Sequence, residues 1–212
     1  MANSVLVADL SHWTWDGGAR VDFGRARAAG TVGVIYKASE GKSYQDPTYQ
    51  KSRKAAKEAG LLWGAFHFGT AASVDAQVSN FLAAADVTDD MFVAIDFEFN
   101  EKSPTNTMSK DQLLAFIQAC ETKLGRPLTI YTGSRMYDVY GASPARELAG
   151  HRVWWARYAA EPQLHPTWST YWLWQYTDGH DGPEPRQVDG LGYCDCNHYA
   201  GTEASLRATW AG

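Results

Sequence analysis

The 212-residue sequence predicts an α/β fold, a TIM-like barrel whose second half lacks helices. Two observations support this fold. Strand-like runs alternate with helix-like stretches up to residue 132, and the strand-like segments after it are joined by irregular loops. The length and a hydrophobic content of 45% are enough to bury one full core, so we expect a single domain over residues 1–212.

The first half of the chain contains strand candidates that alternate with helix candidates. Three helix starts carry capping residues: Asp22, Asp46 followed by a proline, and Ser109 in a capping box with Gln112. Glycines at positions 30, 60 and 125 mark helix ends. We expect strands at 5–9, 32–37, 61–68, 93–100 and 128–132, and helices at 22–30, 46–60, 74–85 and 109–125.

The second half of the chain has three further strand candidates, 152–158, 172–177 and 193–197. Segment 178–192 is rich in glycine, proline and charge. We interpret it as a long loop and not as a linker, because the strand after it would complete the barrel. A short helix over 202–210 follows.

The stretch 93–100 is the centre of the predicted site. Alternate residues from Val93 to Phe99 are apolar, which places Ala94, Asp96 and Glu98 together on the other face of a strand. The backbone positions of the two carboxyl residues lie about 6.6 Å apart, so each raises the proton affinity of the other. Such a pair suits acid–base chemistry on a bond held beside it. The alternative is a pair neutralised by Arg or Lys beneath a loop.

Polar residues recur at the ends of the predicted strands. In a barrel of this type the carboxyl ends of the strands meet on one face, where active sites lie. The residues collected there define a candidate cleft, although a lone histidine is a satisfied core residue about as often as a functional one. The set is Asp9, Lys37, His67, Asp96, Glu98, Tyr131, Gln175 and Asp195.

Composition narrows the class of partner. A net charge of −5 with interspersed signs gives no basic patch for nucleic acid, and no apolar run has the length of a membrane span. Nine tryptophans are more than packing usually requires, and their flat faces suit stacking on sugar rings. A tryptophan-rich core is the alternative explanation.

The cysteines predict neither a disulfide framework nor a metal site. Cys120, Cys194 and Cys196 are an odd set, which fits folding in a reduced compartment. Cys194, Cys196 and His198 could form a metal cluster, but strand alternation turns both sulfur atoms away from Asp195. We therefore favour buried structural thiols, and we expect no metal and no cofactor.

Several catalytic motifs fail in this sequence. Residues 36–43 end like a phosphate-binding loop, but the leading glycine is Tyr36 and Glu40 would face the phosphates. The sequence contains neither G-x-S-x-G nor H-E-x-x-H, so serine acyl chemistry and zinc protease chemistry have no motif.

Nine segments in order resemble motifs of one family over nearly the whole chain. They are Asp9-Leu10-Ser11, Val21-Asp22-Phe23, Lys37-Ala38-Ser39-Glu40-Gly41, Gly64-Ala65-Phe66-His67-Phe68, Asp96-Phe97-Glu98, Ile130-Tyr131-Thr132, Trp155-Ala156-Arg157-Tyr158, Trp174-Gln175-Tyr176-Thr177 and Asp195-Cys196-Asn197. Together they are similar to the lysozymes of glycoside hydrolase family 25, often found as phage endolysins and bacterial autolysins. Phe66 stands where the family usually has tyrosine, and cysteines flank Asp195.

The resemblance implies a flattened (β/α)5(β)3 barrel that hydrolyses the β-1,4 bond from N-acetylmuramic acid to N-acetylglucosamine in peptidoglycan. By position, Glu98 would be the general acid, Asp96 its partner, and Asp9 and Asp195 further acids of the cleft. The expected substrate-binding residues are Lys37, His67, Phe66, Tyr131, Trp155, Tyr158, Gln175 and Trp174.

The expected partners are peptidoglycan glycan strands, bound by a monomer without nucleic acid or membrane. The start of the sequence has no basic segment followed by a long apolar one, which favours a phage endolysin made in a host cytoplasm. A trimmed secreted autolysin would look the same. A chitinase-like hydrolase and a non-catalytic wall-binding relic of the fold remain alternatives.

Overall fold

The computed structural model describes residues 5–16 and 21–212. Residues 1–4, which belong to the start from which the endolysin origin was predicted, and residues 17–20 lie outside this part. Eight strands form a closed ring in the order β1-β2-β4-β5-β6-β7-β8-β11, and β11 pairs back with β1. This confirms the predicted barrel. The strands are β1 (Val5–Leu10), β2 (Thr31–Glu40), β4 (Leu62–Phe68), β5 (Phe92–Asp96), β6 (Thr129–Thr132), β7 (Val153–Ala156), β8 (Leu173–Thr177) and β11 (Asp195–Tyr199).

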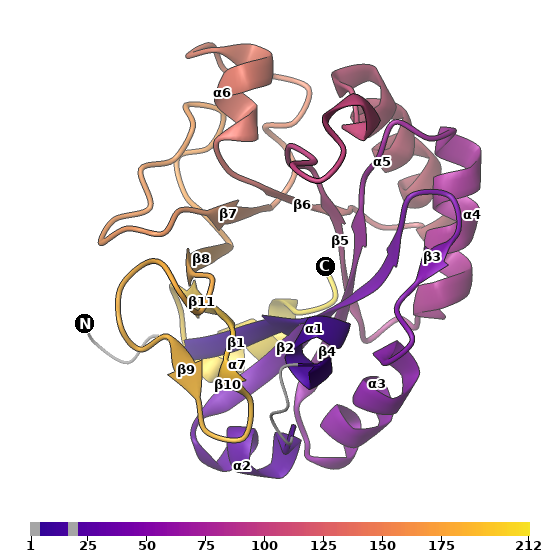
Figure 1. Cartoon of the computed structure of the whole chain (residues 1–212). Coiled ribbons are helices and arrows are strands. Elements are labelled where there is room, and N and C mark those ends of the chain that lie inside the picture. Colours follow the sequence, from indigo (N-terminus) through magenta and orange to yellow (C-terminus); the bar gives the residue numbers. More distant parts are fainter. Residues whose placement is uncertain (1–4, 17–20) are drawn as a thin grey trace.

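The helices lie mainly beside the first strands, as Figure 1 shows, whereas loops flank β7 and β8. The predicted capping box is present, because the Ser109 hydroxyl accepts from the Gln112 backbone amide at 3.3 Å. Asp46 does not begin its helix, which starts at Tyr49 with Thr48 as N-cap. The helices are α1 (His12–Asp16), α2 (Phe23–Ala28), α3 (Tyr49–Glu58), α4 (Val74–Ala85), α5 (Lys110–Leu124), α6 (Arg135–Tyr140), α7 (Glu203–Thr209) and the 3-10 helix η1 (Pro104–Asn106).

The last strand of the barrel runs against the others. β11 is antiparallel to both β1 and β8, and it begins at Asp195, two residues later than predicted. Asp195 therefore lies at the beginning of its strand, yet it pairs with Asp9 at the end of β1. The expectation that Asp195 marks a carboxyl end is wrong, but the reversed direction brings it to the same face.

Short strands appear outside the barrel. β3 (Tyr44–Gln45) extends β2 as a hairpin. β9 (Gln187–Val188) and β10 (Gly192–Tyr193) form a second hairpin, which begins inside segment 178–192 and ends one residue beyond it. The segment is therefore not the plain loop that the sequence predicts.

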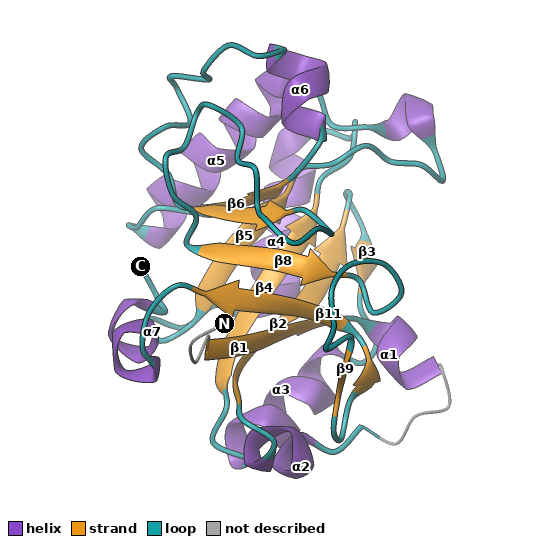
Figure 2. Ribbon diagram, turned by 90° about the vertical axis from the view of Figure 1, so that its left-hand side faces the viewer, coloured by secondary structure: helices purple, strands orange, loops and turns teal. Residues whose placement is uncertain are grey.

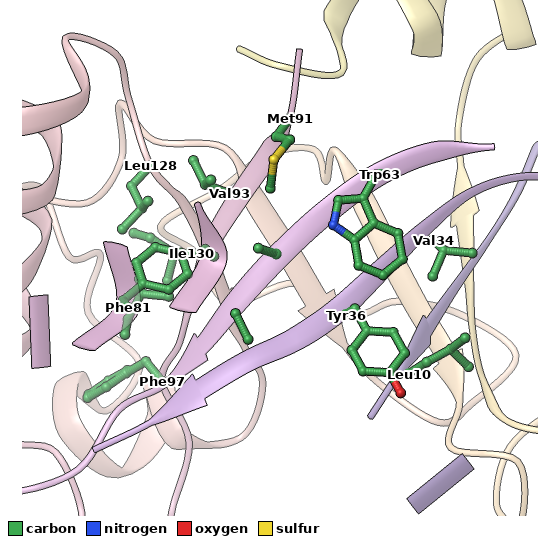
Figure 3. Close-up of a cluster of buried hydrophobic side chains, with 14 of the residues drawn as sticks. Leu10, Val34, Tyr36, Trp63, Phe81, Met91, Val93, Phe97, Leu128 and Ile130 are labelled. Carbon is green, nitrogen blue, oxygen red and sulfur yellow. The ribbon is translucent and has the colours of Figure 1, made fainter. Parts of the chain in front are cut away.

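Strand alternation divides the apolar side chains into an inner and an outer core. Phe92 and Ala94 of β5 belong to the inner core, and Val93 and Ile95 belong to the outer core between strands and helices. Figure 3 shows part of the outer core around Tyr36, Trp63 and Phe97. Phe99 does not continue the outer face, because β5 ends at Asp96 and the Phe99 side chain is 44% exposed.

Helix α7 covers the end of the barrel opposite to α1 (Figure 2). Leu206 of α7 and Trp210, which follows the helix, are part of the inner core. A Cβ atom at Gly33 would lie 2.8 Å from the Trp210 ring, so only glycine lets the indole approach β2 this closely. Leu206 and Trp210 thus pack into this end of the inner core. No helix among the described residues is both long and apolar enough to cross a membrane.

Candidate active site

A cleft with a volume of about 250 Å³ lies at the carboxyl ends of the parallel strands. Four carboxyl groups from three strands or their extensions meet in it, among aromatic side chains of the inner core. The lining residues are Asp9, Leu10, Ser11, Trp13, Lys37, Phe66, Phe68, Asp96, Glu98, Tyr131, Trp154, Tyr158, Gln175 and Asp195.

Asp96 and Glu98 occupy consecutive inward positions at the end of β5. Phe97 between them points outward, and its backbone amide donates to the Tyr131 carbonyl oxygen at 2.9 Å. Its own carbonyl oxygen accepts from the Thr132 hydroxyl at 2.9 Å. These two bonds to β6 continue the extended backbone past the last residue of β5. Both carboxyl groups are therefore held toward the cleft.

The surroundings of this pair keep a proton on it near neutral pH. Burial raises the pKa of Glu98 to about 7, and nearby Lys37 opposes this shift. Burial, and then the charge of Glu98, raise the pKa of Asp96 well above its usual range. Lys37 itself is paired with Glu40, at 2.5 Å between Nζ and Oε2. The two carboxyl groups therefore titrate as a unit and lose their protons in separate steps.

One oxygen of Asp96 is unusual in this cleft. Its Oδ1 is buried and has no hydrogen-bond partner among the described residues, although the side chain lines the cavity. A buried carboxyl oxygen without a hydrogen-bond partner lowers the stability of the fold. Such atoms are concentrated at sites where a bound ligand supplies the missing hydrogen bond. Asp96 Oδ1 is therefore a candidate position for a donor from a bound ligand.

Asp9 has the opposite environment. Its two oxygens accept from Gln175 Nε2 at 3.2 and 3.0 Å, and Oδ2 also accepts from Asn197 Nδ2 at 2.8 Å. Burial raises the pKa of Asp9 to about 6, and the bonds from the two amides counteract that rise.

The orientation of both amides is fixed by further donors. The hydroxyl groups of Tyr131 and Tyr158 donate to Gln175 Oε1 at 2.8 and 2.9 Å. The indole of Trp154 donates to Asn197 Oδ1 at 2.5 Å. Since each amide oxygen is occupied, each amide must present its NH2 group to Asp9. The network thus favours the ionised form of Asp9.

Asp195 lies beside Asp9 across the β1–β11 pair. Burial and the charge of Asp9 raise its pKa well above the usual range. Cys194 and Cys196 belong to the outer core, as alternation predicts, and their sulfur atoms are 4.0 Å apart. No group of three or more His, Cys, Asp or Glu side chains within the described ranges is placed to hold a metal ion.

Three predicted substrate contacts point away from the cleft. His67 is fully buried in the outer core, where it stacks on Phe116 and contacts the Ser39 hydroxyl at 2.8 Å. Burial lowers its pKa to about 4, so it is neutral. Trp174 is 5% exposed and donates to the Arg157 carbonyl oxygen at 2.8 Å. His67 and Trp174 therefore do not line the cleft, because their strand neighbours Phe66 and Gln175 face it.

Trp155 is also not in the cleft. It is 1% exposed, points outward from β7 and only borders a neighbouring chamber. The same alternation turns Trp154 inward, where its ring meets Phe66 edge-on at 6.0 Å. Trp154 was missed by the sequence argument, as was Asn197, which was quoted in a motif but given no role. Alternation from Asp195 would have placed Asn197 on the inner face.

Trp13 is a further lining residue that the sequence argument did not select. It is 61% exposed at the edge of the cleft, with Lys102 Nζ 5.0 Å from its ring centroid. Its exposed flat face is of the kind that stacks on sugar rings. The remaining predicted residues do meet in the cleft: Asp9, Lys37, Phe66, Asp96, Glu98, Tyr131, Tyr158, Gln175 and Asp195.

A closed barrel with paired acids at this face is typical of glycoside hydrolases. The profile of the glycosyl hydrolases family 25 matches residues 8–184. The chain therefore belongs to family 25, as its motifs predict, and it is a glycoside hydrolase of the lysozyme type.

Individual relatives agree with this assignment. The chain is 25% identical to Lysozyme M1 of Streptomyces globisporus, over 97% of this chain and 71% of that protein. It is 27% identical to "Uncharacterized protein YegX" of Escherichia coli O157:H7, over 94% and 71% respectively. The crystal structure of the bacterial lysozyme from Streptomyces coelicolor superposes with a TM-score of 0.82, at 25% identity, and covers 100% of this chain and 99% of that chain.

Proposed function

We propose that the protein is an N-acetylmuramidase, which cleaves the β-1,4 bond between N-acetylmuramic acid and N-acetylglucosamine in peptidoglycan. The observation that carries this proposal is the Asp96–Glu98 pair, held side by side in a cleft and protonated near neutral pH. Membership of family 25 and the similarity to Lysozyme M1 support the choice of substrate.

In this proposal Glu98 is the general acid. A pKa of about 7 keeps its proton available at neutral pH, so that it can protonate the oxygen of the leaving sugar. Asp9 is held ionised by its amide donors, and with Asp195 it lines the wall of the same cleft. A negative charge there stabilises the positive charge that develops on the reacting sugar.

Asp96 is proposed to hold the acetamido group of the substrate and not to attack the anomeric carbon itself. Asp96 and Glu98 leave the same face of one strand, whereas a direct nucleophile must approach from the side opposite to the acid. Asp96 Oδ1 is free to accept the acetamide N–H. That bond favours ionised Asp96 and leaves the shared proton on Glu98. The carbonyl oxygen of the acetamide can then close on the anomeric carbon.

The test is mass spectrometry of products from purified peptidoglycan after borohydride reduction. A muramidase leaves reduced N-acetylmuramic acid at each new end. Reduced N-acetylglucosamine would contradict the proposed bond. Turnover of chitin oligomers at a comparable rate would favour a chitinase-like enzyme, and binding without turnover would favour a non-catalytic relic.

We also propose that the protein acts as a monomer and originates as a phage endolysin, released to the wall through a separate membrane protein. Endolysins occur among proteins with the same fold, such as the CTP1L endolysin, at a TM-score of 0.70. Analytical ultracentrifugation tests the oligomeric state, and the mass of a single chain is expected. The gene's neighbourhood tests the origin, because phage structural and membrane-lesion genes beside it are expected, and a purely bacterial neighbourhood would contradict it.

A further inference from the structure

A second chamber, with a volume of about 640 Å³, opens directly beside the cleft. The two cavities share Glu98, Tyr131 and Tyr158. A volume of this size lies within the range of roughly 300–1,000 Å³ that is usual for small-ligand sites. Because the shared wall includes Glu98, a group attached to a sugar at Glu98 can enter the chamber directly.

Arg157 brings an uncompensated positive charge to the chamber. Its backbone is fixed on both sides, since its amide donates to the Gln175 carbonyl oxygen at 3.0 Å and its carbonyl oxygen accepts from Trp174 at 2.8 Å. Its side chain is exposed, and the described part of the chain offers the guanidinium no acidic partner within 4.0 Å. The backbone position of Arg157 is therefore fixed, and no carboxylate of the described residues neutralises its guanidinium charge.

The residue that orients Arg157 has a strained backbone. Gln163 accepts from Arg157 Nη2 at 3.0 Å, and its φ angle is +40°. A non-glycine residue rarely adopts this conformation, and such strain is concentrated at binding and catalytic sites. The preceding residue is also held by a hydrogen bond, because the indole N–H of Trp155 donates to the Pro162 carbonyl oxygen at 2.7 Å.

Arg135 adds a second guanidinium on the same chamber. Among the described residues its only acidic partner is Asp138, at a long 3.8 Å, and it donates to the Met108 carbonyl oxygen at 3.5 Å. Its Nε has no partner among the described residues. Glu98 and Glu101 also line this wall, and burial raises the pKa of Glu98 to about 7. The lining of the chamber thus offers two guanidinium groups to an anion.

We propose that this chamber binds the stem peptide of muramic acid, with Arg157 and Arg135 contacting a peptide carboxylate. The inference rests on the proposed function, because muramic acid is the sugar of the glycan that carries a lactyl group and, through it, a peptide with free carboxylates. A guanidinium fork matches a carboxylate in both geometry and charge. The chamber thus distinguishes peptide-bearing glycan from bare glycan.

The experiment compares two substrates for the full chain. One is peptidoglycan with its stem peptides, and the other is the same glycan after an amidase has removed them. We expect Arg157→Gln to lower the ratio of kcat/KM for the first over the second substrate by about tenfold, which is typical of a lost charged hydrogen bond. Arg157→Lys should restore part of the ratio, because it keeps the charge and loses the fork.

Arg146→Gln is the matched control, since Arg146 is an exposed arginine outside both cavities. It should leave the ratio unchanged. An equal loss on both substrates in Arg157→Gln, or no loss, would overturn the peptide site. If the wild-type protein releases no muramic acid ends from either substrate, the proposed function itself fails, which is a distinguishable result.

Discussion

Asp9 and Asp96 are both buried acids of one cleft, at the ends of β1 and β5, but their hydrogen bonding differs. Asp9 accepts from two amides that are themselves locked in place by Trp154, Tyr131 and Tyr158. Asp96 has an oxygen that finds no hydrogen-bond partner in the described part of the chain. A fully bonded carboxylate supplies a fixed charge, whereas an unfilled one is ready for a ligand. From this difference we propose charge stabilisation for Asp9 and substrate contact for Asp96.

The largest effect is expected from Glu98→Gln, which removes the acid and keeps the shape. Activity should fall by about 10²- to 10⁴-fold, the usual contribution of a general acid. The raised pKa of Glu98 means that the carboxyl group favours folding at low pH and loses this contribution as pH rises through about 7. The melting temperature of the variant relative to wild type should therefore be higher at pH 8 than at pH 5. Substantial turnover by the variant would contradict Glu98 as acid.

Asp96→Asn should lower kcat by about 10²- to 10³-fold, because the amide cannot replace the charge beside the reacting centre. The variant also separates the coupled pair. The wild-type rate should decline as pH rises past about 7, as Glu98 loses its proton. In the variant this limb should move to lower pH, since the mutual repulsion is gone. A pH–rate profile with an unmoved limb would show that the two groups do not interact.

Trp154→Phe tests whether the hydrogen-bond network around Asp9 sets the pKa of Asp9. It removes the indole N–H that donates to Asn197 Oδ1, so that only the bond from Asn197 Nδ2 to the Val7 carbonyl oxygen, at 3.0 Å, still orients the amide that donates to Asp9. The pKa of Asp9 should rise above about 6, and the low-pH limb of kcat/KM should move upward, with a loss of about tenfold. Trp172→Phe is the matched control, because the Trp172 indole N–H has no partner among the described residues. Identical profiles for the two variants would refute the locked amide.

Replacing Cys194 and Cys196 together by alanine should affect stability alone. Both thiols pack in the outer core, so we expect a loss of about 1–3 kcal/mol in the free energy of unfolding and a nearly unchanged kcat. Denaturant unfolding and kinetics on the folded fraction check this, with Cys120→Ala in α5 as the comparison. A lower kcat at unchanged stability would mean that the thiols influence Asp195.

The smallest effect is expected from metal removal, since the proposed chemistry needs only carboxyl groups. Dialysis against EDTA should leave the rate unchanged within error. A loss that zinc or calcium restores would refute metal-independent catalysis.

Local signals in the sequence predicted much of the fold. The capping box at Ser109 and the inward placement of Asp96 and Glu98 follow from neighbouring residues alone, and both are present. The direction of β11 was not predictable, because hydrophobic periodicity is the same for a strand and its reverse. Asp195 reached the cleft through that reversal.

The site was predicted less completely than the fold, for two physical reasons. Adjacent residues of a strand face opposite sides, so Trp174 could not share the cleft with Gln175, nor His67 with Phe66. Motif matching had selected both members of each pair. Alternation gives the inward direction of Trp154 and Asn197, but the hydrogen bond between them joins strands far apart in the chain, and no local pattern reveals it.

The most direct test of the contrast between Asp9 and Asp96 is inhibition by a thiazoline mimic of the bicyclic intermediate, with the inhibition constant measured for wild type and Asp96→Asn. We predict that the mimic inhibits the wild-type enzyme and that Asp96→Asn weakens its binding at least tenfold, because Asp96 Oδ1 meets the ring nitrogen. Absence of inhibition, together with a fluorosugar ester trapped on Asp96 in mass spectrometry, would contradict the account.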